Sequence, residues 1–375
     1  MALSTRKNMT FDFESIARRE IEGLPVYSPG LDIDDVKSRY GVTEVIKLAS
    51  NENPLGPSPK AVEALRDALQ DVSLYPDGAC VALHEKLSQK LGVAPESLVF
   101  GNGTDEVIDL LFYAFFNPGD VAVMGDPTFS SYFLSGMVMG ARIAYVPLAE
   151  HRHDIDRMLE LAGDGARAVF IATPHNPTGA ICTRAEFERM LARLPEDVLL
   201  IWDEAYAEYV DDPDYPNSLN YIEKYPNLVV LRTFSKCYGL AGLRVGYGIA
   251  HPQIVTCLER VRPPFNVNRL AQVAATAALD DVEHIERSRR VNSDGKRFLA
   301  SELDGMGMAP VPTQANFMLF KYDYVADALP ERLLERGIIV RDGAALGYPG
   351  YIRLTIGAPE QNRAVIDAIR EIAGL

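Results

Sequence analysis

Short apolar runs recur through the middle of the chain, and within them polar residues do not alternate with apolar ones. The runs cover residues 98–100, 121–124, 143–146, 168–171, 198–202 and 228–231. Continuous apolar runs of this kind are expected of strands that are covered on both faces. Helical stretches separate several of the runs, and one of them begins at Thr183 and Glu186 with the sequence of a capping box. This alternation predicts an α/β fold, doubly wound around a mostly parallel sheet.

The pattern differs on both sides of this region, which indicates a second and smaller unit. Before it, residues 46–49 predict a short strand, and Ser58 followed by Pro59 predicts the start of a helix. After it come a long charged helix over residues 282–303 and a run at residues 351–356 in which apolar and polar residues alternate. Such alternation predicts a strand that is covered on one face only. We therefore expect a smaller α+β domain built from both ends of the chain.

The expected division of the chain follows from these changes of pattern. Residues 1–50 form an N-terminal arm and part of the small domain, residues 51–275 the large domain, and residues 276–375 the small C-terminal domain. A weak helical pattern covers residues 13–21, and a last amphipathic helix covers residues 360–373.

The formal net charge of −15 over 375 residues argues against nucleic acid as a partner, because phosphate binding needs basic patches. An anionic ligand would therefore need a local cluster of cationic side chains or helix N-termini. No run approaches the roughly 18 apolar residues of a membrane span, and the polar residues 1–8 predict no signal peptide. The four cysteines have no C-x-x-C spacing, which disfavours a zinc site and fits a reducing cytosol. We expect a cytoplasmic protein without a membrane partner.

One short stretch, His151-Arg152-His153, could suggest a metal site. No acidic or cysteine partner stands in register with it. We therefore expect this stretch to be solvated surface, and we expect no metal.

Residues with chemical potential follow the predicted strands directly, and in open parallel sheets ligands bind beyond the carboxyl ends of the strands. Residues 101–106 open a helix with small residues, which suits either a phosphate cradle or a simple helix cap. Phe129 offers a ring beside the same crevice, although by itself it is more typical of a core residue. Asn176 stands in a loop with two prolines, where a turn role is the alternative.

Two charged residues end strands where burial without a partner would be costly. Asp203 comes directly after the run at residues 198–202, with Tyr206 close behind it. Lys236 follows the run at residues 228–231. Taken alone, Lys236 is a surface lysine of a loop; the alternative is a lysine whose amine forms a covalent bond to a carbonyl group.

Together these residues suit pyridoxal phosphate. Its aldehyde needs a lysine, its ring nitrogen needs a carboxylate, and its phenolic oxygen needs Asn and Tyr donors. Its phosphate needs N–H groups, a hydroxyl group and a guanidinium group. The helix start at residues 101–106 offers the N–H groups, Ser235 the hydroxyl group and Arg244 the guanidinium group. A P-loop or a dinucleotide-binding fold is excluded because neither glycine motif is present after a first strand.

Three motifs resemble those of the fold-type-I pyridoxal-phosphate aminotransferases. They are Asn-Pro-Thr-Gly at 176–179, Asp-Glu-Ala-Tyr at 203–206 and Ser-Lys-x-Tyr-Gly-Leu-Ala-Gly-Leu-Arg-x-Gly-Tyr at 235–247. The resemblance covers essentially the whole chain, and the motifs stand in the right order. It implies a large domain with a mostly parallel, seven-stranded type of sheet and a smaller α+β domain. Narrower motifs, among them Ser-Asn-Glu-Asn-Pro at 50–54 and Arg-Pro-Pro-Phe-Asn-Val-Asn at 262–268, resemble the histidinol-phosphate aminotransferases within that superfamily.

The resemblance also implies roles for individual residues. Lys236 would hold the aldehyde and move the proton, Asp203 would pair with the ring nitrogen, and Tyr206 would bind the phenolic oxygen together with Asn176. The remaining cofactor contacts would come from Gly103, Thr104, Asp105, Phe129, Ser235, Arg244 and, from a second subunit, Tyr75. The substrate would be bound by Tyr27, Asn53, Arg341 and Arg353.

The activity implied by the resemblance is transamination between L-histidinol phosphate and 2-oxoglutarate in histidine biosynthesis, giving imidazole-acetol phosphate and L-glutamate, by a homodimer whose subunits share the site. Two alternatives keep the fold: an aminotransferase for phenylalanine or tyrosine, and a decarboxylase of an amino-acid phosphate. They stay open because arginines that bind a phosphate also bind carboxylates. A regulator that senses pyridoxal phosphate is disfavoured, since the chain is acidic and its N-terminal segment is too short for a DNA-binding domain.

Overall fold

Seven strands from the middle of the chain form one sheet in the computed structural model, which describes residues 16–24, 31–322 and 327–375. Their spatial order is β2 (Leu98–Gly101), β8 (Gly246–Ala250), β7 (Leu228–Thr233), β6 (Leu199–Asp203), β5 (Ala166–Ala172), β3 (Val121–Asp126) and β4 (Arg142–Pro147). Only β8 runs antiparallel to its neighbours, so the predicted mostly parallel sheet is confirmed.

Strand β8 was not predicted, because glycines interrupt its apolar pattern. Its register on β2 and β7 needs those glycines: a Cβ at Gly246 would collide with the backbone of Thr104, and a Cβ at Gly248 would crowd Val99. The glycines of this strand therefore allow the start of the helix after β2 to approach the sheet closely.

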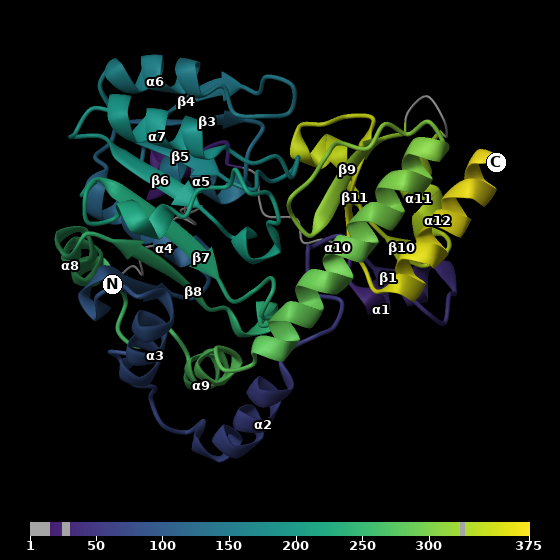
Figure 1. Ribbon diagram of the computed structural model, residues 1–375, viewed down its shortest axis with the longest axis horizontal. Helices are drawn as coiled ribbons and strands as arrows, with labels where there is room; N and C mark the ends of the chain where they lie inside the picture. Colours follow the sequence, from purple (N-terminus) through teal and green to yellow (C-terminus); the bar gives the residue numbers. More distant parts are fainter. Residues whose placement is uncertain (1–15, 25–30, 323–326) are drawn as a thin grey trace, which may run out of the picture.

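Alternate residues of the central strands point to opposite faces of the sheet, and each face has its own core. In β5, Val169 and Ile171 belong to one core, whereas Ala168 and Phe170 belong to the other. Helices cover both faces, as the continuous apolar runs predicted (Figure 1). Residues of α6 (Ile155–Gly163), α7 (Arg184–Arg193) and α9 (Arg269–Ala278) join the first core, and residues of α4 (Thr104–Phe115), α5 (Ser130–Val138) and α8 (Pro252–Val261) join the second. Further helices on the first side are α2 (Pro59–Ala68) and α3 (Val81–Leu91).

A second body is built from residues 31–50 and from the C-terminal part of the chain (Figure 1). Its antiparallel sheet has the order β11 (Arg341–Asp342), β12 (Tyr351–Thr355), β9 (Phe317–Lys321), and β1 (Ile46–Lys47) pairs in parallel with β10 (Ile338–Ile339). Its helices are α1 (Ile33–Tyr40), α10 (Val282–Gly305), α11 (Leu329–Leu334) and α12 (Pro359–Ala373). The pairing of β1 with β10 joins residues from the two ends of the chain, while the division at residues 50 and 275 stays a prediction.

The prediction that residues 351–356 are covered on one face only is wrong. Ile352 and Leu354 join the core of the small body, but Arg353 and Thr355 on the other face are also buried, with 6% and 2% of their surface exposed. They are covered because this face lies against the segment after β1: Thr355 accepts a hydrogen bond from the backbone N–H of Asn51 (2.9 Å). The alternating pattern therefore distinguishes an apolar core from a polar seam between the two bodies.

Two further predictions are wrong, one for the stretch at residues 151–153 and one for the helix at residues 13–21. His153 is buried, its Nε2 lies 3.1 Å from the carbonyl oxygen of Ala172 and its ring packs edge-on against His175, so it is not solvated. Of the helix expected at residues 13–21, the described part shows only a short 3-10 turn at Arg19–Ile21. The described ranges contain no cluster of three or more metal-binding side chains and no helix long and apolar enough to cross a membrane.

Candidate active site

A cavity of about 290 Å³ lies beyond the carboxyl ends of the central strands, at the seam between the two bodies. It collects side chains from the loops after β2, β3, β5, β6 and β7, as the strand-end rule predicted. The predicted residues that line it are Thr104, Asp105, Phe129, Asn176, Asp203, Tyr206, Ser235, Lys236 and Arg244. The structure therefore brings together residues that are spread over positions 104–244 of the sequence.

Asp203 lies at the end of β6, and its carboxylate has protein donors on both oxygens. Oδ1 accepts from the backbone N–H of Ala205 (3.0 Å), and Oδ2 accepts from the hydroxyl group of Tyr132 (2.6 Å). Burial raises the pKa of Asp203 to about 6, and within the described residues no cation forms an ion pair with it. A buried carboxylate that lacks a counter-charge fits a ligand with a protonated ring nitrogen.

Lys236 stands on the loop after β7, and its Nζ donates to the carbonyl oxygen of Ser50 (3.1 Å). Burial, followed by the charge of Arg353, lowers the pKa of Lys236 to about 8. Nζ also lies 5.7 Å from the centre of the Tyr206 ring. A larger neutral fraction makes the amine a better nucleophile, so the environment fits a lysine that reacts with a carbonyl group.

The start of α4 and the loop after β7 form a site that fits a phosphate group. The Nη2 atom of Arg244 donates to Asp105 (3.0 Å), and Nη1 donates to the hydroxyl group of Ser235 (3.4 Å). Gly103 caps α4 with a φ of 82° and no side-chain hydrogen bond, and a Cβ there would collide with the guanidinium group of Arg244. Free N–H groups at a helix N-terminus, a hydroxyl group and a guanidinium group are the groups that bind phosphates.

Asn176 and Tyr206 belong to the large body, and both contact side chains of the small body across the seam. The Oδ1 atom of Asn176 accepts from Arg353 Nη1 (2.6 Å), which leaves the amide N–H groups of Asn176 available to a ligand. The hydroxyl group of Tyr206 accepts from Asn51 Nδ2 (3.1 Å), and its ring packs edge-on against Phe317 of β9. Both side chains are therefore held by groups of the other body.

Three successive carbonyl groups after β1 support the site, and this feature was not predicted. Ala49 accepts from Arg353 Nη2 (2.8 Å), Ser50 accepts from Lys236, and Asn51 accepts from Asn316 Nδ2 (2.9 Å). Asn51 has a φ of 58°, a left-handed conformation that asparagine tolerates better than most residues. The motif Ser-Asn-Glu-Asn-Pro was the available signal, but its spacing does not show which residues its backbone would contact.

Arg353 and Arg341 are partners across the antiparallel pair of β12 and β11. Burial lowers the pKa of Arg353 to about 10, and its Nε has no hydrogen-bond partner among the described residues. Arg341 is half-buried. Two guanidinium groups on neighbouring strands can bind an anion such as a phosphate or carboxylate group.

The structure does not bring every predicted residue to the cavity. Gly103, Asn53, Arg341 and Arg353 are not among the residues that line it. The amide of Asn53 donates to the Cys237 carbonyl oxygen and to the Ser288 hydroxyl group (2.8 Å each). Tyr75 is 78% exposed and stacks on Phe265 with ring centroids 4.8 Å apart. Tyr27 lies outside the described residues.

Comparison with known proteins adds the family and the fold. A family model described as aminotransferase class I and II matches residues 43–369. The chain is 49% identical over 356 residues to a histidinol-phosphate aminotransferase from Moorella thermoacetica, covering 95% of this chain and 92% of that protein. It is 46% identical over 355 residues to one from Brevibacillus brevis, covering 95% and 98%.

Solved structures of aminotransferases superimpose on this chain over nearly its whole length. A crystal structure of histidinol-phosphate aminotransferase from Sinorhizobium meliloti in complex with pyridoxal-5'-phosphate superimposes with a TM-score of 0.87 at 27% identity, covering 96% of this chain and 98% of that one. Aspartate aminotransferase from Thermus thermophilus superimposes with a TM-score of 0.81 at 21% identity, which reflects the fold alone.

Proposed function

This chain belongs to the family of class I and II aminotransferases, and from that premise we propose that it transfers an amino group between L-histidinol phosphate and 2-oxoglutarate with pyridoxal phosphate as cofactor. The products are imidazole-acetol phosphate and L-glutamate, and the reaction serves histidine biosynthesis. The assignment of histidinol phosphate as substrate is supported by the near full-length similarity, at 42–49% identity, to relatives named histidinol-phosphate aminotransferase.

Pyridoxal phosphate, when bound, supplies an aldehyde that accepts an amino group and a ring that withdraws electrons from the reacting carbon. Asp203 would hold the ring nitrogen, since its buried carboxylate lacks a cationic partner. Ser235, Arg244 and the N–H groups at the start of α4 would bind the phosphate. Asn176 and Tyr206 would donate to the phenolic oxygen.

Lys236 would hold the aldehyde end and then move a proton at the α-carbon of the substrate. Its pKa near 8 suits both tasks, because the amine is readily protonated and deprotonated near neutral pH. The carbonyl oxygen of Ser50 orients the amine, and the ring of Tyr206 covers it.

Arg353 and Arg341 would bind the anionic group that is common to the two substrates. L-histidinol phosphate carries a phosphate group and 2-oxoglutarate carries carboxylates, and guanidinium groups bind both. One site can then serve both halves of the reaction, with each substrate entering after the previous product leaves.

A single-turnover experiment tests the substrate. Purified protein loaded with pyridoxal phosphate is mixed separately with histidinol phosphate, phenylalanine, tyrosine and glutamate, and the visible absorption of the cofactor is followed. We expect histidinol phosphate and glutamate to react fastest. A faster reaction with phenylalanine would contradict the proposal and favour an aromatic aminotransferase, and release of carbon dioxide would favour a decarboxylase.

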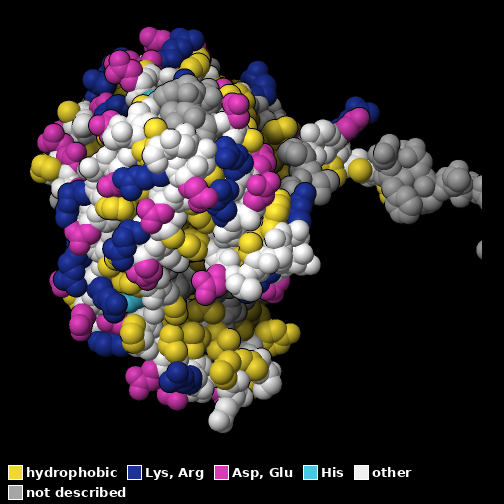
Figure 2. Space-filling model, turned by 90° about the vertical axis from the view of Figure 1, so that its right-hand side faces the viewer, with side chains coloured by type: hydrophobic (Ala, Val, Ile, Leu, Met, Phe, Trp, Pro, Cys, Tyr) yellow, Lys and Arg dark blue, Asp and Glu magenta, His cyan; other side chains and the backbone are white. Residues whose placement is uncertain are grey.

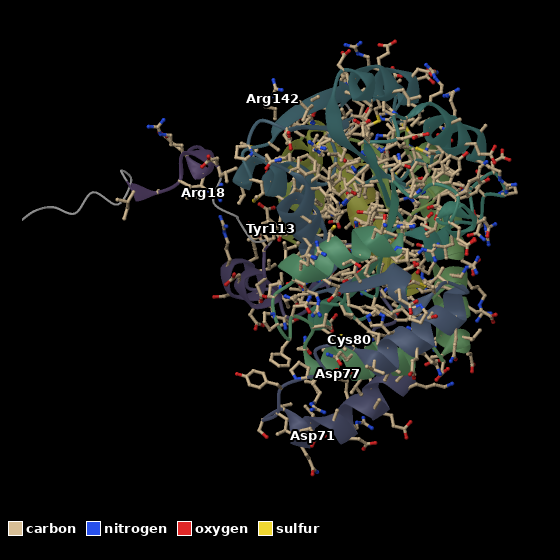
Figure 3. All side chains as sticks on the ribbon, turned by 90° about the vertical axis from the view of Figure 1, so that its left-hand side faces the viewer. Arg18, Asp71, Asp77, Cys80, Tyr113 and Arg142 are labelled. Carbon is tan, nitrogen blue, oxygen red and sulfur yellow. The ribbon has the colours of Figure 1, made fainter. Side chains whose placement is uncertain are left out.

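We also propose a homodimer with shared sites, in the cytoplasm. The segment between α2 and α3, on which Asp71 and Asp77 are labelled in Figure 3, lies at the lower end of the molecule, and its apolar side chains are exposed. They are Leu69, Val72, Leu74 and Tyr75, and Val81 at the start of α3 is exposed too. Apolar side chains also gather at this level, that of α2 and α9, in Figure 2. An exposed apolar surface of this kind supports contact with a second copy.

Mixing two inactive variants tests the shared site. Lys236→Ala and Tyr75→Ala proteins are each assayed alone and after subunit exchange. If Tyr75 completes the partner's site, mixed dimers contain one site with neither defect and regain activity. Failure to regain activity in a mixture that light scattering shows to be dimeric would contradict sharing.

A further inference from the structure

Tyr132 of α5 is buried completely, yet its hydroxyl group reaches the cavity. It donates to Asp203 Oδ2 at 2.6 Å, and this bond joins residues 71 positions apart. The ring is held between Phe129 and Phe170, with centroids 5.6 and 5.3 Å away. A fixed ring leaves the hydroxyl group one place to donate, which is the carboxylate.

The charges around Asp203 explain why this donor matters. Asp105 on α4 and Glu204 on β6's end are like charges that oppose ionisation of Asp203. The two cationic side chains that line the cavity have other partners, because Lys236 donates to Ser50 and Arg244 donates to Asp105. Only the Tyr132 hydroxyl group and the Ala205 N–H, of the described groups, donate to the carboxylate. Hydrogen bonds to a charged acceptor stabilise its charged form.

The same turn of α5 also contacts the phosphate side of the site. The hydroxyl group of Ser131 donates to Asp105 Oδ1 (2.7 Å), and Asp105 Oδ2 holds Arg244. The first turn of α5 therefore reaches both ends of the proposed cofactor site, through Tyr132 and through Ser131.

We propose that Tyr132 is a positioning residue, which orients Asp203 and keeps its carboxylate ionised opposite the ring nitrogen of the cofactor. Without the hydroxyl group, the proton shared by Asp203 and the ring nitrogen would move toward Asp203, and the ring would withdraw electrons less strongly. The inference rests on the proposed cofactor, but not on the choice of amino donor.

The test uses Tyr132→Phe, which keeps the ring and removes the donor, and Tyr145→Phe, an exposed tyrosine of β4, as matched control. Titration of the apoprotein gives the dissociation constant for pyridoxal phosphate, and NMR of cofactor labelled at the ring nitrogen reports where the proton lies. We expect the affinity to fall roughly 10- to 100-fold in Tyr132→Phe, from one charge-assisted hydrogen bond. We also expect a nitrogen resonance moved toward the unprotonated position and a lower kcat at unchanged KM, with Tyr145→Phe like the wild type.

A double-mutant cycle separates this role from packing. In an Asp203→Asn background, Tyr132→Phe should change neither the cofactor affinity nor the nitrogen resonance any further. Equal effects in both backgrounds, or a loss of thermal stability with an unchanged resonance, would overturn the proposal.

These outcomes can be told apart from failure of the proposed function. The affinity and the nitrogen resonance are measured without any substrate, so a different amino donor leaves them unchanged. Wild-type protein that binds no pyridoxal phosphate would instead remove the premise itself.

Discussion

The two walls of the cavity are built in different ways. The wall of the large body is made by strand ends: Asp203 ends β6 and Lys236 follows β7, and both lie where parallel strands of one sheet finish. The opposite wall comes from Ser50, Asn51 and Glu52 after β1, and long-range contacts hold it in place, in which Arg353 of β12 reaches Asn176 and the carbonyl oxygen of Ala49. The first wall depends on the topology of one sheet, whereas the second depends on how two bodies pack together.

This difference suggests that cofactor chemistry and substrate selectivity depend on different walls of the cavity. The strand-end wall would hold the cofactor, whose chemistry is common to the family. The seam carries Arg353, paired with Arg341 on the neighbouring strand, and both would bind the anionic group of each substrate. Changes to the first wall should therefore abolish reactions in general, and changes to the second should alter which substrates are bound and how tightly.

The largest effect is expected for Lys236→Ala. Removal of the amine eliminates both the covalent partner of the aldehyde and the group that moves the proton, so kcat should fall by about 10⁴-fold or more. Steady-state rates with histidinol phosphate measure the loss, and Lys224→Ala on the surface is the control. Activity within tenfold of the wild type would contradict the role of Lys236, and with it the assignment of the reaction to the strand-end wall.

A large effect on stability is expected for Asp203→Asn in the apoprotein. The ordinary pKa of 3.8 rises to about 6 on burial, so the folded state binds the proton more tightly than the unfolded state and loses stability as the pH rises from about 4 to 6. Above that range the cost is fully present. Replacing the carboxylate should then stabilise the apoprotein by up to about 3 kcal/mol.

Urea unfolding at about pH 7.5 and about pH 4 measures this difference. The gain from Asp203→Asn should be present at the higher pH and fade at the lower one, where the wild-type carboxyl group is protonated in the folded state. A gain that is equal at both pH values would show that the charge of Asp203 is not its cause.

A smaller loss is expected for Arg353→Lys on the seam. A single ammonium group cannot bind Asn176, Ala49 and a substrate anion as the guanidinium fork does, so kcat/KM should fall by about 100-fold for both substrates, chiefly through KM. Arg363→Lys, an exposed position of α12, is the control. A loss confined to one substrate would sharpen the comparison, because it would show that the two substrates use different anion sites.

The smallest effect is expected for Asn51→Gly. Glycine tolerates the φ of 58° at this position, so the change removes the amide that binds Tyr206 without straining the backbone. The same amide accepts from the Thr355 hydroxyl group (3.1 Å), and loss of the neutral bond to Tyr206 predicts a loss of about tenfold in kcat/KM. Asn217→Gly on an exposed loop serves as control. No change in kcat/KM would mean that Tyr206 does not need support from the seam.

Much of the strand-end wall could be predicted from the sequence. The apolar runs predicted the central strands, and the rule that ligands bind beyond their carboxyl ends gathered Asn176, Asp203 and Lys236 into one crevice. The physical reason is that each of these residues follows its own strand directly, so the local pattern that defines the strand also places the residue.

The tertiary structure alone decided the remaining parts. Tyr132 lies 71 positions from Asp203, and Ala49 lies 304 positions from Arg353. Local periodicity places Arg353 on the polar side of a strand and does not single out Tyr132, and it carries no information about which distant group either side chain meets. Burial of Arg353 and Thr355 required the packing of the second body against the first. Local sequence patterns thus indicate which strands end in candidate site residues. The packing of the two bodies determines which distant groups support the charged side chains, because no local pattern encodes those contacts.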